Sequence, residues 1–215
     1  MDIHRVYGVF LNHFRSRRMQ AFFDEFDPQA TTSIIDVGGT PFNWQLIGTS
    51  AQVTMVNLQL PSEGVDALPP NLESVVGDGT SLEYENDSYD VVFSNSVIEH
   101  VGNWEAQQAF ADELRRVGRG LWVQTPARGF PVEPHLIALF IHWLPRHWER
   151  RLVRRFTGWG LITRPSPQRI DEVLDELVLL DGEQMRELFP DCEIRRERFL
   201  GMTKAYLAVR PSIEH

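Results

Sequence analysis

The chain has 215 residues, of which 42% are hydrophobic, so it is long enough to bury one sizeable core and too short for two ordinary catalytic domains. Its formal net charge of −9 argues against a nucleic acid as the main ligand, because contact with a phosphate backbone needs an excess of basic residues. Cys192 is the only cysteine, which excludes a disulfide framework and a thiolate metal cluster. We expect one domain over residues 1–215, with the cytoplasm as the default compartment.

The most apolar stretch of the sequence, residues 136–144, is too short to cross a membrane. It has nine residues, against the roughly 20 that a helical span needs. The N-terminus lacks the long apolar core and the small-residue cleavage site of a signal peptide. We therefore expect neither a transmembrane segment nor export, and peripheral contact with a membrane stays open.

Apolar residues recur at near-helical spacing between Tyr7 and Phe26, which predicts an amphipathic N-terminal helix within residues 1–30. Short apolar runs that end in glycine, proline or polar residues then predict five buried parallel strands. These strands are Ser33–Val37, Gln52–Leu58, Ser74–Val76, Tyr89–Ser94 and Leu121–Thr125.

A surface helix is predicted over Trp104–Val117, ended by Gly118 and Gly120. Residues 128–180 break the alternation and predict an insertion that forms a lid over the active site. The last elements are a helix over Asp181–Phe189, with Asp181 as its N-cap, and a closing strand pair, Ile194–Phe199 and Ala205–Val209. The fold class is α/β: a Rossmann-like doubly wound sheet, mostly parallel with an antiparallel closing strand, and with helices on both faces.

Polar or glycine residues follow successive predicted strands. Asp36, Gly38 and Gly39 form a turn whose backbone can approach a ligand closely, with the N-terminal end of the next helix directed towards it. Asn57 lies 21 positions after Asp36, near the offset at which Rossmann units bind ribose hydroxyls. Asp78 follows the third strand, where a carboxylate can accept a hydrogen bond from an adenine amino group. The GxGxxG pattern that a dinucleotide pyrophosphate needs is missing.

These segments resemble class I S-adenosylmethionine-dependent methyltransferases, through IIDVGGTP, VNL, VGDG, YDVVFSNSVIEHV and LWVQTP in that order. The resemblance implies S-adenosyl-L-methionine as cofactor. It places the methionine moiety at the glycine turn, the ribose at Asn57, the adenine at Asp78 and Gly79, and the sulfonium near Ser94. The predicted cofactor site comprises Asp36, Gly38, Gly39, Thr40, Asn57, Leu58, Asp78, Gly79, Thr80, Ser94 and Asn95. The chain departs from the family pattern in two ways: Thr40 and Phe42 replace two glycines, and Asn57 replaces an acidic residue.

The catalytic candidates follow the fourth and fifth strands. His100 can take a proton from an acceptor hydroxyl, and the same role is open to His135 or Glu133 on a loop stiffened by prolines. Helix packing for His100, and bracing of the insertion for the other two, are the competing interpretations. Some members of the resembling family bind a metal through E-x-x-E-H, but Ser96 replaces the first Glu, so we expect no metal.

The sequence therefore predicts methylation of a hydroxyl on a small molecule, sugar or glycan, with no nucleic acid partner. Two alternatives stay open: a non-catalytic module that binds S-adenosylmethionine or S-adenosylhomocysteine, and a methyltransferase for a lipid-linked acceptor at a membrane surface. The second rests on the insertion, where an aromatic and apolar block precedes several arginines. This block forms either a lid helix with solvated arginines or a surface that binds anionic lipid or a phosphorylated acceptor.

Overall fold

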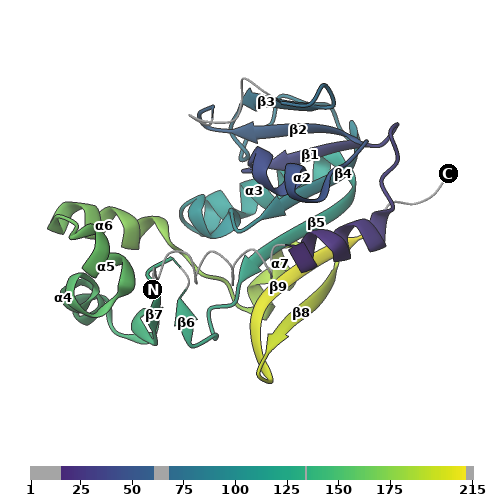
Figure 1. The fold of residues 1–215 in the computed structure, drawn as a ribbon. Helices are drawn as coiled ribbons and strands as arrows, with labels where there is room; N and C mark the ends of the chain where they lie inside the picture. The colour runs from purple at the N-terminus through teal and green to yellow at the C-terminus, as the bar shows by residue number, and fades with distance from the viewer. Residues whose placement is uncertain (1–15, 61–67, 134, 212–215) are drawn as a thin grey trace.

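The structure, a computed structural model, describes residues 16–60, 68–133 and 135–211. A seven-stranded sheet in the order β3-β2-β1-β4-β5-β9-β8 organises it (Figure 1). Five strands run parallel, and β9 and β8 close the sheet as an antiparallel hairpin. The strands are β1 Ser33–Val37, β2 Gln52–Asn57, β3 Leu72–Val76, β4 Tyr89–Asn95, β5 Gly118–Pro126, β8 Glu193–Phe199 and β9 Met202–Arg210. The predicted fold class is confirmed.

Helices cover both faces of this sheet. On one face, α3 and α7 pack over the inward side chains of β1, β4 and β5. On the other face, a helix over residues 16–26 and the short α2 bury Phe22 and Trp44 against Phe93 and Trp122. These helices are α2 Pro41–Ile47, α3 Trp104–Val117 and α7 Gly182–Leu188. The part of the predicted N-terminal helix before residue 16 lies outside the described residues.

The segment after β5 holds six short elements. They are β6 Val132–Glu133, β7 Ala138–Leu139, the 3-10 helix η2 Ile141–Trp143, α4 Arg146–Phe156, α5 Gly158–Thr163 and α6 Pro167–Glu176. Their apolar side chains form a separate small core around Leu136, Val153 and Leu174. Figure 1 shows α4, α5 and α6 gathered to one side of the sheet. Within the described residues, no helix combines the length and apolar character that a bilayer span requires.

Several strand boundaries differ from the prediction by one to three residues, most clearly the starts of β5 and β9. Gly118 and Gly120 lie inside β5, paired with Tyr89 and Val91 of β4, rather than between a helix and a strand. Gly118 is needed there because a Cβ atom at this position would lie 2.3 Å from a methyl group of Val92. The strand β3 begins at Leu72, two residues earlier than expected.

The N-terminus of α7 matches the prediction closely. The Asp181 carboxylate accepts hydrogen bonds from the backbone N–H groups of Glu183 and Gln184, and the Gln184 side chain accepts one from the Asp181 N–H. This reciprocal pair is a capping box, which satisfies N–H groups that have no partner within the helix. It fixes where α7 begins, beneath β9.

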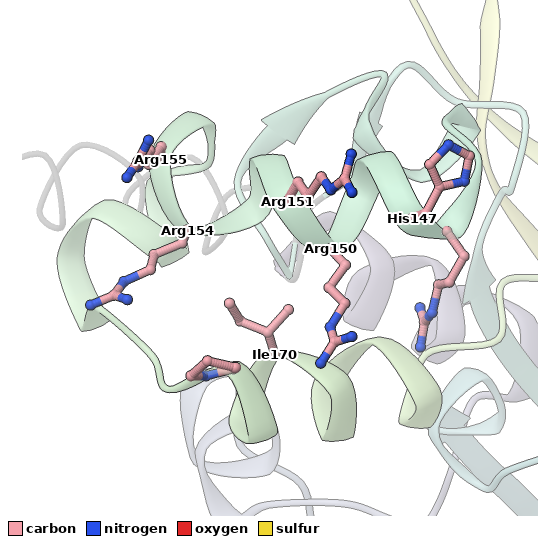
Figure 2. Close-up of a pocket in the computed structure, with 8 residues that line it drawn as sticks. His147, Arg150, Arg151, Arg154, Arg155 and Ile170 are labelled. Atoms are coloured by element: carbon pink, nitrogen blue, oxygen red, sulfur yellow. The ribbon is translucent and has the colours of Figure 1, made fainter.

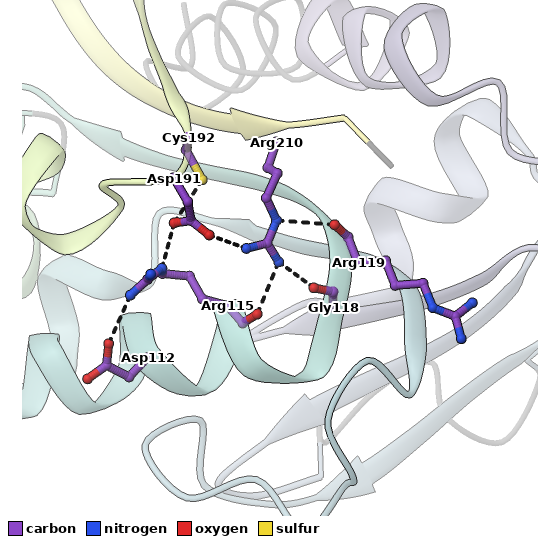
Figure 3. A network of polar contacts seen from close by, with 7 residues as sticks. All are labelled: Asp112, Arg115, Gly118, Arg119, Asp191, Cys192 and Arg210. Atoms are coloured by element: carbon purple, nitrogen blue, oxygen red, sulfur yellow. Dashed lines mark hydrogen bonds and ion pairs between the residues drawn. The ribbon is translucent and has the colours of Figure 1, made fainter. Parts of the chain in front are cut away.

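One arginine joins the last strand to the end of α3 (Figure 3). The Arg210 guanidinium donates to the backbone oxygens of Arg115, Gly118 and Arg119, and it pairs with Asp191. Arg115 pairs with the same carboxylate at 2.6 Å. Although burial alone raises the pKa of Asp191, the two arginines hold it below its usual value. The network therefore fastens the hairpin to the parallel part of the sheet.

We predict that Arg210→Met destabilises the protein by about 1.5–3 kcal/mol, because it removes hydrogen bonds from a charged donor and leaves backbone oxygens without their partner. Urea unfolding followed by circular dichroism measures the change. Arg169→Met is the matched control, since Arg169 is half exposed on α6 and its ion pairs lie at the surface. A loss in Arg210→Met no larger than in the control would contradict the role of the network.

Candidate active site

The first feature of the site is the turn after β1, where the backbone is too crowded for side chains. Gly38 has φ of +81°, a conformation that L side chains rarely adopt, and a Cβ atom on it would lie 2.3 Å from Val97 Cγ2. A Cβ atom on Gly39 would lie 1.9 Å from the Asp36 carboxylate. Both glycines are therefore required by the packing. The following helix, α2, has only seven residues, so its N-terminus supplies a weaker dipole than the sequence suggested.

Asp36 at the end of β1 is almost completely buried. Trp44 Nε1 of α2 donates a 2.7 Å hydrogen bond to its Oδ2, while Oδ1 has no hydrogen-bond partner among the described residues. Burial raises the pKa of Asp36 to about 7, although the hydrogen bond from Trp44 opposes this shift. An acidic group with a free oxygen thus lies directly under the turn.

The ends of β2 and β3 also carry polar residues: one contacts the glycine turn, and the other forms a second polar loop. Asn57 Nδ2 donates a 2.8 Å hydrogen bond to the Gly39 carbonyl, so its amide links the ends of β2 and β1. After β3, Asp78 Oδ1 accepts hydrogen bonds of 2.8 Å from both the backbone N–H and the hydroxyl of Thr80. Gly79 lies against Phe110, where a Cβ atom would clash. Leu58 is exposed beside this edge.

Ser94 and Asn95 end β4 on the other side of the turn. The buried Ser94 hydroxyl donates to the Val37 carbonyl at 2.9 Å and so ties β4 to the end of β1. Asn95 Oδ1 accepts a 2.7 Å hydrogen bond from Arg18 of the N-terminal helix. Arg18 also donates to Gln124 of β5 and pairs with Glu197 of β8. Arg18 thereby connects the N-terminal helix to β4, β5 and β8.

An acid-base cluster follows β4 and β5. Glu133 of β6 is fully buried, accepts from the Leu136 N–H, and lies 2.7 Å from His135 Nδ1. His135 Nε2 lies 3.1 Å from His100 Nε2, with the two rings edge to face. Since a carboxylate only accepts, His135 Nδ1 carries a proton. The two Nε2 atoms then share one proton between them.

Electrostatics distinguish the two histidines. Burial and the neighbouring His135 lower the pKa of His100 to about 4, so His100 is neutral at physiological pH. Burial alone lowers the pKa of His135 as well, but the Glu133 carboxylate outweighs it and raises that pKa above its ordinary value. A proton that reaches this cluster is therefore held on His135.

Glu99 adds a buried carboxyl to the cluster. It lies in the 3-10 helix η1, Ile98–His100, and its Oε2 accepts a 2.8 Å hydrogen bond from the Thr125 hydroxyl. Its Oε1 has no hydrogen-bond partner in the part of the chain that the structure describes, and burial raises the pKa to about 7. Glu99, His100 and His135 each offer one atom of a type that ligates metals, all within 4.8 Å of one another. The geometry thus suits either proton transfer or a divalent ion.

Comparisons with known proteins decide the family. The methyltransferase domain family model matches residues 39–120, which run from Gly39 through α2, β2 to β4 and α3 to the start of β5. Residues 39–120 carry the methyltransferase domain, and the strand order around them is that of the class I S-adenosylmethionine-dependent methyltransferases. The predicted family and enzyme class are confirmed, and S-adenosyl-L-methionine is the methyl donor of this family. The alternative of a non-catalytic module is set aside.

Solved structures share the fold of this methyltransferase at low sequence identity. A methyltransferase from Methanosarcina mazei is 14% identical with a TM-score of 0.51, over 84% of this chain and 92% of that one. The putative methyltransferase in complex with the Haloferax volcanii Trm112 activator is 10% identical with a TM-score of 0.57, over 99% and 95%. Phosphoethanolamine N-methyltransferase 2 from Haemonchus contortus is 13% identical with a TM-score of 0.53, over 84% and 38%. No curated protein matches the chain in sequence.

The structure gathers the predicted site residues of this methyltransferase at one edge of the sheet. The cofactor candidates lie at the carboxyl ends of β3, β2, β1 and β4, which are neighbours, and His100, His135 and Glu133 lie beside them. Glu99 and Arg18 were not predicted as site residues. Glu99 had a signal in its position next to His100, whereas the contacts of Arg18 join segments far apart in the sequence.

Asp36→Asn tests the buried carboxyl. Asp36 keeps its proton up to about pH 7 when folded and only to about pH 4 when unfolded, so stability falls as the pH rises through this window. Asn cannot ionise and can still accept from Trp44. We expect the melting temperature of the unliganded variant to fall less than that of the wild type between about pH 5 and pH 8. Asp112→Asn, at an exposed position on α3, is the control. An unchanged pH dependence in Asp36→Asn would refute the assignment.

Proposed function

We propose that this methyltransferase transfers the methyl group of S-adenosylmethionine to a hydroxyl of a small molecule, sugar or glycan. The chain of contacts Glu133–His135–His100 carries the proposal, because it provides a proton acceptor with a buried anion behind it. Methylation of a hydroxyl requires that the oxygen lose its proton, whereas a metal-free transfer to an already deprotonated or strongly nucleophilic atom needs no such relay.

On the cofactor side, we assign the turn formed by Asp36, Gly38 and Gly39 to the methionine moiety. The unpartnered Oδ1 of Asp36 supports this assignment, since a buried acceptor without a donor suits an ammonium group. We assign Asn57 and the neighbouring Leu58 to the ribose and the Asp78–Thr80 loop to the adenine. Thr40 belongs to the turn, while Ser94 and Asn95 support its far side through the contacts of β4.

On the acceptor side, we assign His135 as the base. Its Nδ1–H is directed to Glu133, which leaves Nε2 to receive a proton. This proton comes from the acceptor hydroxyl by way of His100, whose Nε2 lies 3.1 Å from His135 Nε2. The resulting imidazolium is stabilised by the Glu133 carboxylate, in the way that a buried carboxylate orients and supports a catalytic histidine. His100, held neutral by burial, is the relay and Glu133 the orienting anion.

The insertion over residues 128–180 supplies the lid in this proposal. It carries His135 at its start and returns to the sheet at Leu180, whose backbone accepts a hydrogen bond from the Arg128 N–H. Between these points Val178 N–H donates to the Glu99 carbonyl, so the segment is fixed to the catalytic cluster at both ends. Its aromatic side chains suit an acceptor with both apolar and hydroxylated faces.

The test is radiolabelled methyl transfer to panels of sugars, phenols and primary amines, after calorimetry has established cofactor binding. We expect transfer to hydroxyl compounds, and a loss of about 10²- to 10⁴-fold in kcat in His135→Ala with cofactor affinity unchanged. His147→Ala, an exposed histidine on α4, is the control. Transfer to amines only, or full activity in His135→Ala, would overturn the proposal.

The pH profile tests the Glu133–His135 pair. Because His135 must be neutral to accept a proton, kcat/KM rises as the pH passes its raised pKa. Glu133→Gln removes the anion that raises this pKa, so we expect the rise to move to lower pH and the maximal rate to fall. Glu172→Gln, an exposed position on α6, leaves the profile unchanged. An unshifted rise in Glu133→Gln would contradict the assignment.

Dialysis against a chelator tests whether the histidine cluster acts as a base or as a metal site, since both roles would use the same atoms. The proposal expects transfer to survive, because an ion on both Nε2 atoms would leave neither of them to accept a proton. If activity is lost and returns with a divalent ion, the role of His135 as base is wrong and hydroxyl activation belongs to the metal.

A further inference from the structure

The insertion differs from the rest of the chain in charge. Between Leu136 and Pro165 there are six arginines and one acidic residue, Glu149, whereas the whole chain has a net charge of −9. Six of the 21 basic residues therefore lie in one 30-residue segment that has a single acidic residue. A negatively charged partner is attracted to this segment and repelled by most of the remaining surface.

The same segment exposes large apolar side chains. Nine of the fifteen large hydrophobic residues that are exposed in the described part of the chain lie between Ile137 and Ile162. Four are aromatic, namely Phe140, Trp143, Trp148 and Phe156, and they are 49%, 51%, 49% and 71% exposed. The small core of the insertion is formed by other residues, and among the four aromatic side chains Trp143 donates a hydrogen bond from Nε1 to the Arg128 carbonyl. A cluster of this kind marks an interaction surface.

The helix α4 shows how the two properties are arranged. Arg146, Arg150 and Arg154 are spaced four residues apart and line a groove of about 900 Å³ towards α6 (Figure 2). Arg146 and Arg150 are paired there with Asp175 and Asp171 of α6. This face of α4 therefore serves partly to hold the two helices together.

Trp148, Arg151 and Arg155 lie at i, i+3 and i+7 of α4, and the two arginines also line the groove. The Arg151 guanidinium lies over the Trp148 ring, 5.9 Å from its centroid. Arg155 pairs with no acidic residue in the described ranges, and Figure 2 shows it pointing away from the α6 helix. The helices η2 and α5, which pack against α4, add Trp143 and Leu161. Exposed aromatic and basic side chains are thus interspersed along this segment.

We propose that the surface formed by Phe140, Trp143, Trp148, Arg151, Arg155 and Phe156 docks on a bilayer that contains anionic lipids. Tryptophan inserts at the boundary between headgroups and acyl chains because its apolar ring carries a polar N–H, and phenylalanine adds apolar surface there. The arginines contact lipid phosphates at the same depth. The positive charge of the arginines is complementary to anionic headgroups. A bilayer is favoured over an acidic protein because it contacts exposed aromatic rings and arginines at the same time.

Vesicle flotation of the full chain tests this proposal. The vesicles are phosphatidylcholine alone, or phosphatidylcholine mixed with phosphatidylglycerol, each at low and high salt. We expect flotation with the mixed vesicles at low salt, weakened by high salt because the charged contacts are screened. Arg151→Gln is expected to reduce the partition coefficient about fivefold, and Arg151→Gln/Arg155→Gln about 25-fold. Trp143→Ser/Trp148→Ser removes the aromatic contribution and is expected to abolish flotation.

Two controls keep the test decisive. Leu200→Ser removes an exposed apolar residue from the β8–β9 turn, and Arg169→Gln removes an exposed arginine from α6; both should float as the wild type does. Calorimetry with S-adenosylhomocysteine shows that the surface variants keep their fold. Absence of flotation with anionic vesicles, or flotation unchanged in both double variants, overturns the proposal. Self-association that is lost in Trp143→Ser/Trp148→Ser, without vesicle binding, also overturns it in favour of a protein interface.

Discussion

The contact between Gly38 and Val97 is the constraint on which the site depends. Val97 follows β4 and leads into η1, while Gly38 makes the turn after β1. Only a residue without a side chain fits at position 38, because a Cβ atom there would clash with Val97. Because Glu99 and His100 come two and three residues after Val97, this contact sets how far the acid-base cluster lies from the turn after β1. The Ser94 hydroxyl, bonded to the Val37 carbonyl, holds the same two strands together from within the sheet.

The order of the seven sheet strands and of the helices α3 and α7 could be predicted because these elements have local causes. A buried parallel strand needs apolar residues on both faces, as in Ser33–Val37, and α7 begins at a capping box whose residues are adjacent in sequence. The start of β5 could not be predicted in this way. Gly118 has the residue type that ends helices, yet its place is decided by Val92, a residue of the neighbouring strand.

The site likewise has features that the local sequence predicts and features that depend on tertiary contacts. Residues at strand ends, such as Asp36, Asn57 and Asp78, could be identified from their order along the chain, since parallel strands end at a common edge. The environment that governs their chemistry comes from elsewhere. Trp44 supplies the hydrogen bond to Asp36, and Thr125 supplies the one to Glu99 from a different strand. Tertiary contacts of this kind leave no periodic signal in the sequence.

Two buried carboxyls have raised pKa values, and one of them, Asp36, lies at the turn to which we assign the cofactor. Asp36 and Glu99 both have a pKa of about 7, because burial disfavours their charged forms. A cation placed near such a group favours its ionised form and releases the proton it held. S-adenosylmethionine carries a sulfonium and an ammonium, so binding at the proposed turn would convert Asp36 to the carboxylate that the unliganded protein resists. The burial that costs stability without the cofactor would then strengthen the attraction once it is bound, because the same low-dielectric surroundings increase the interaction between opposite charges.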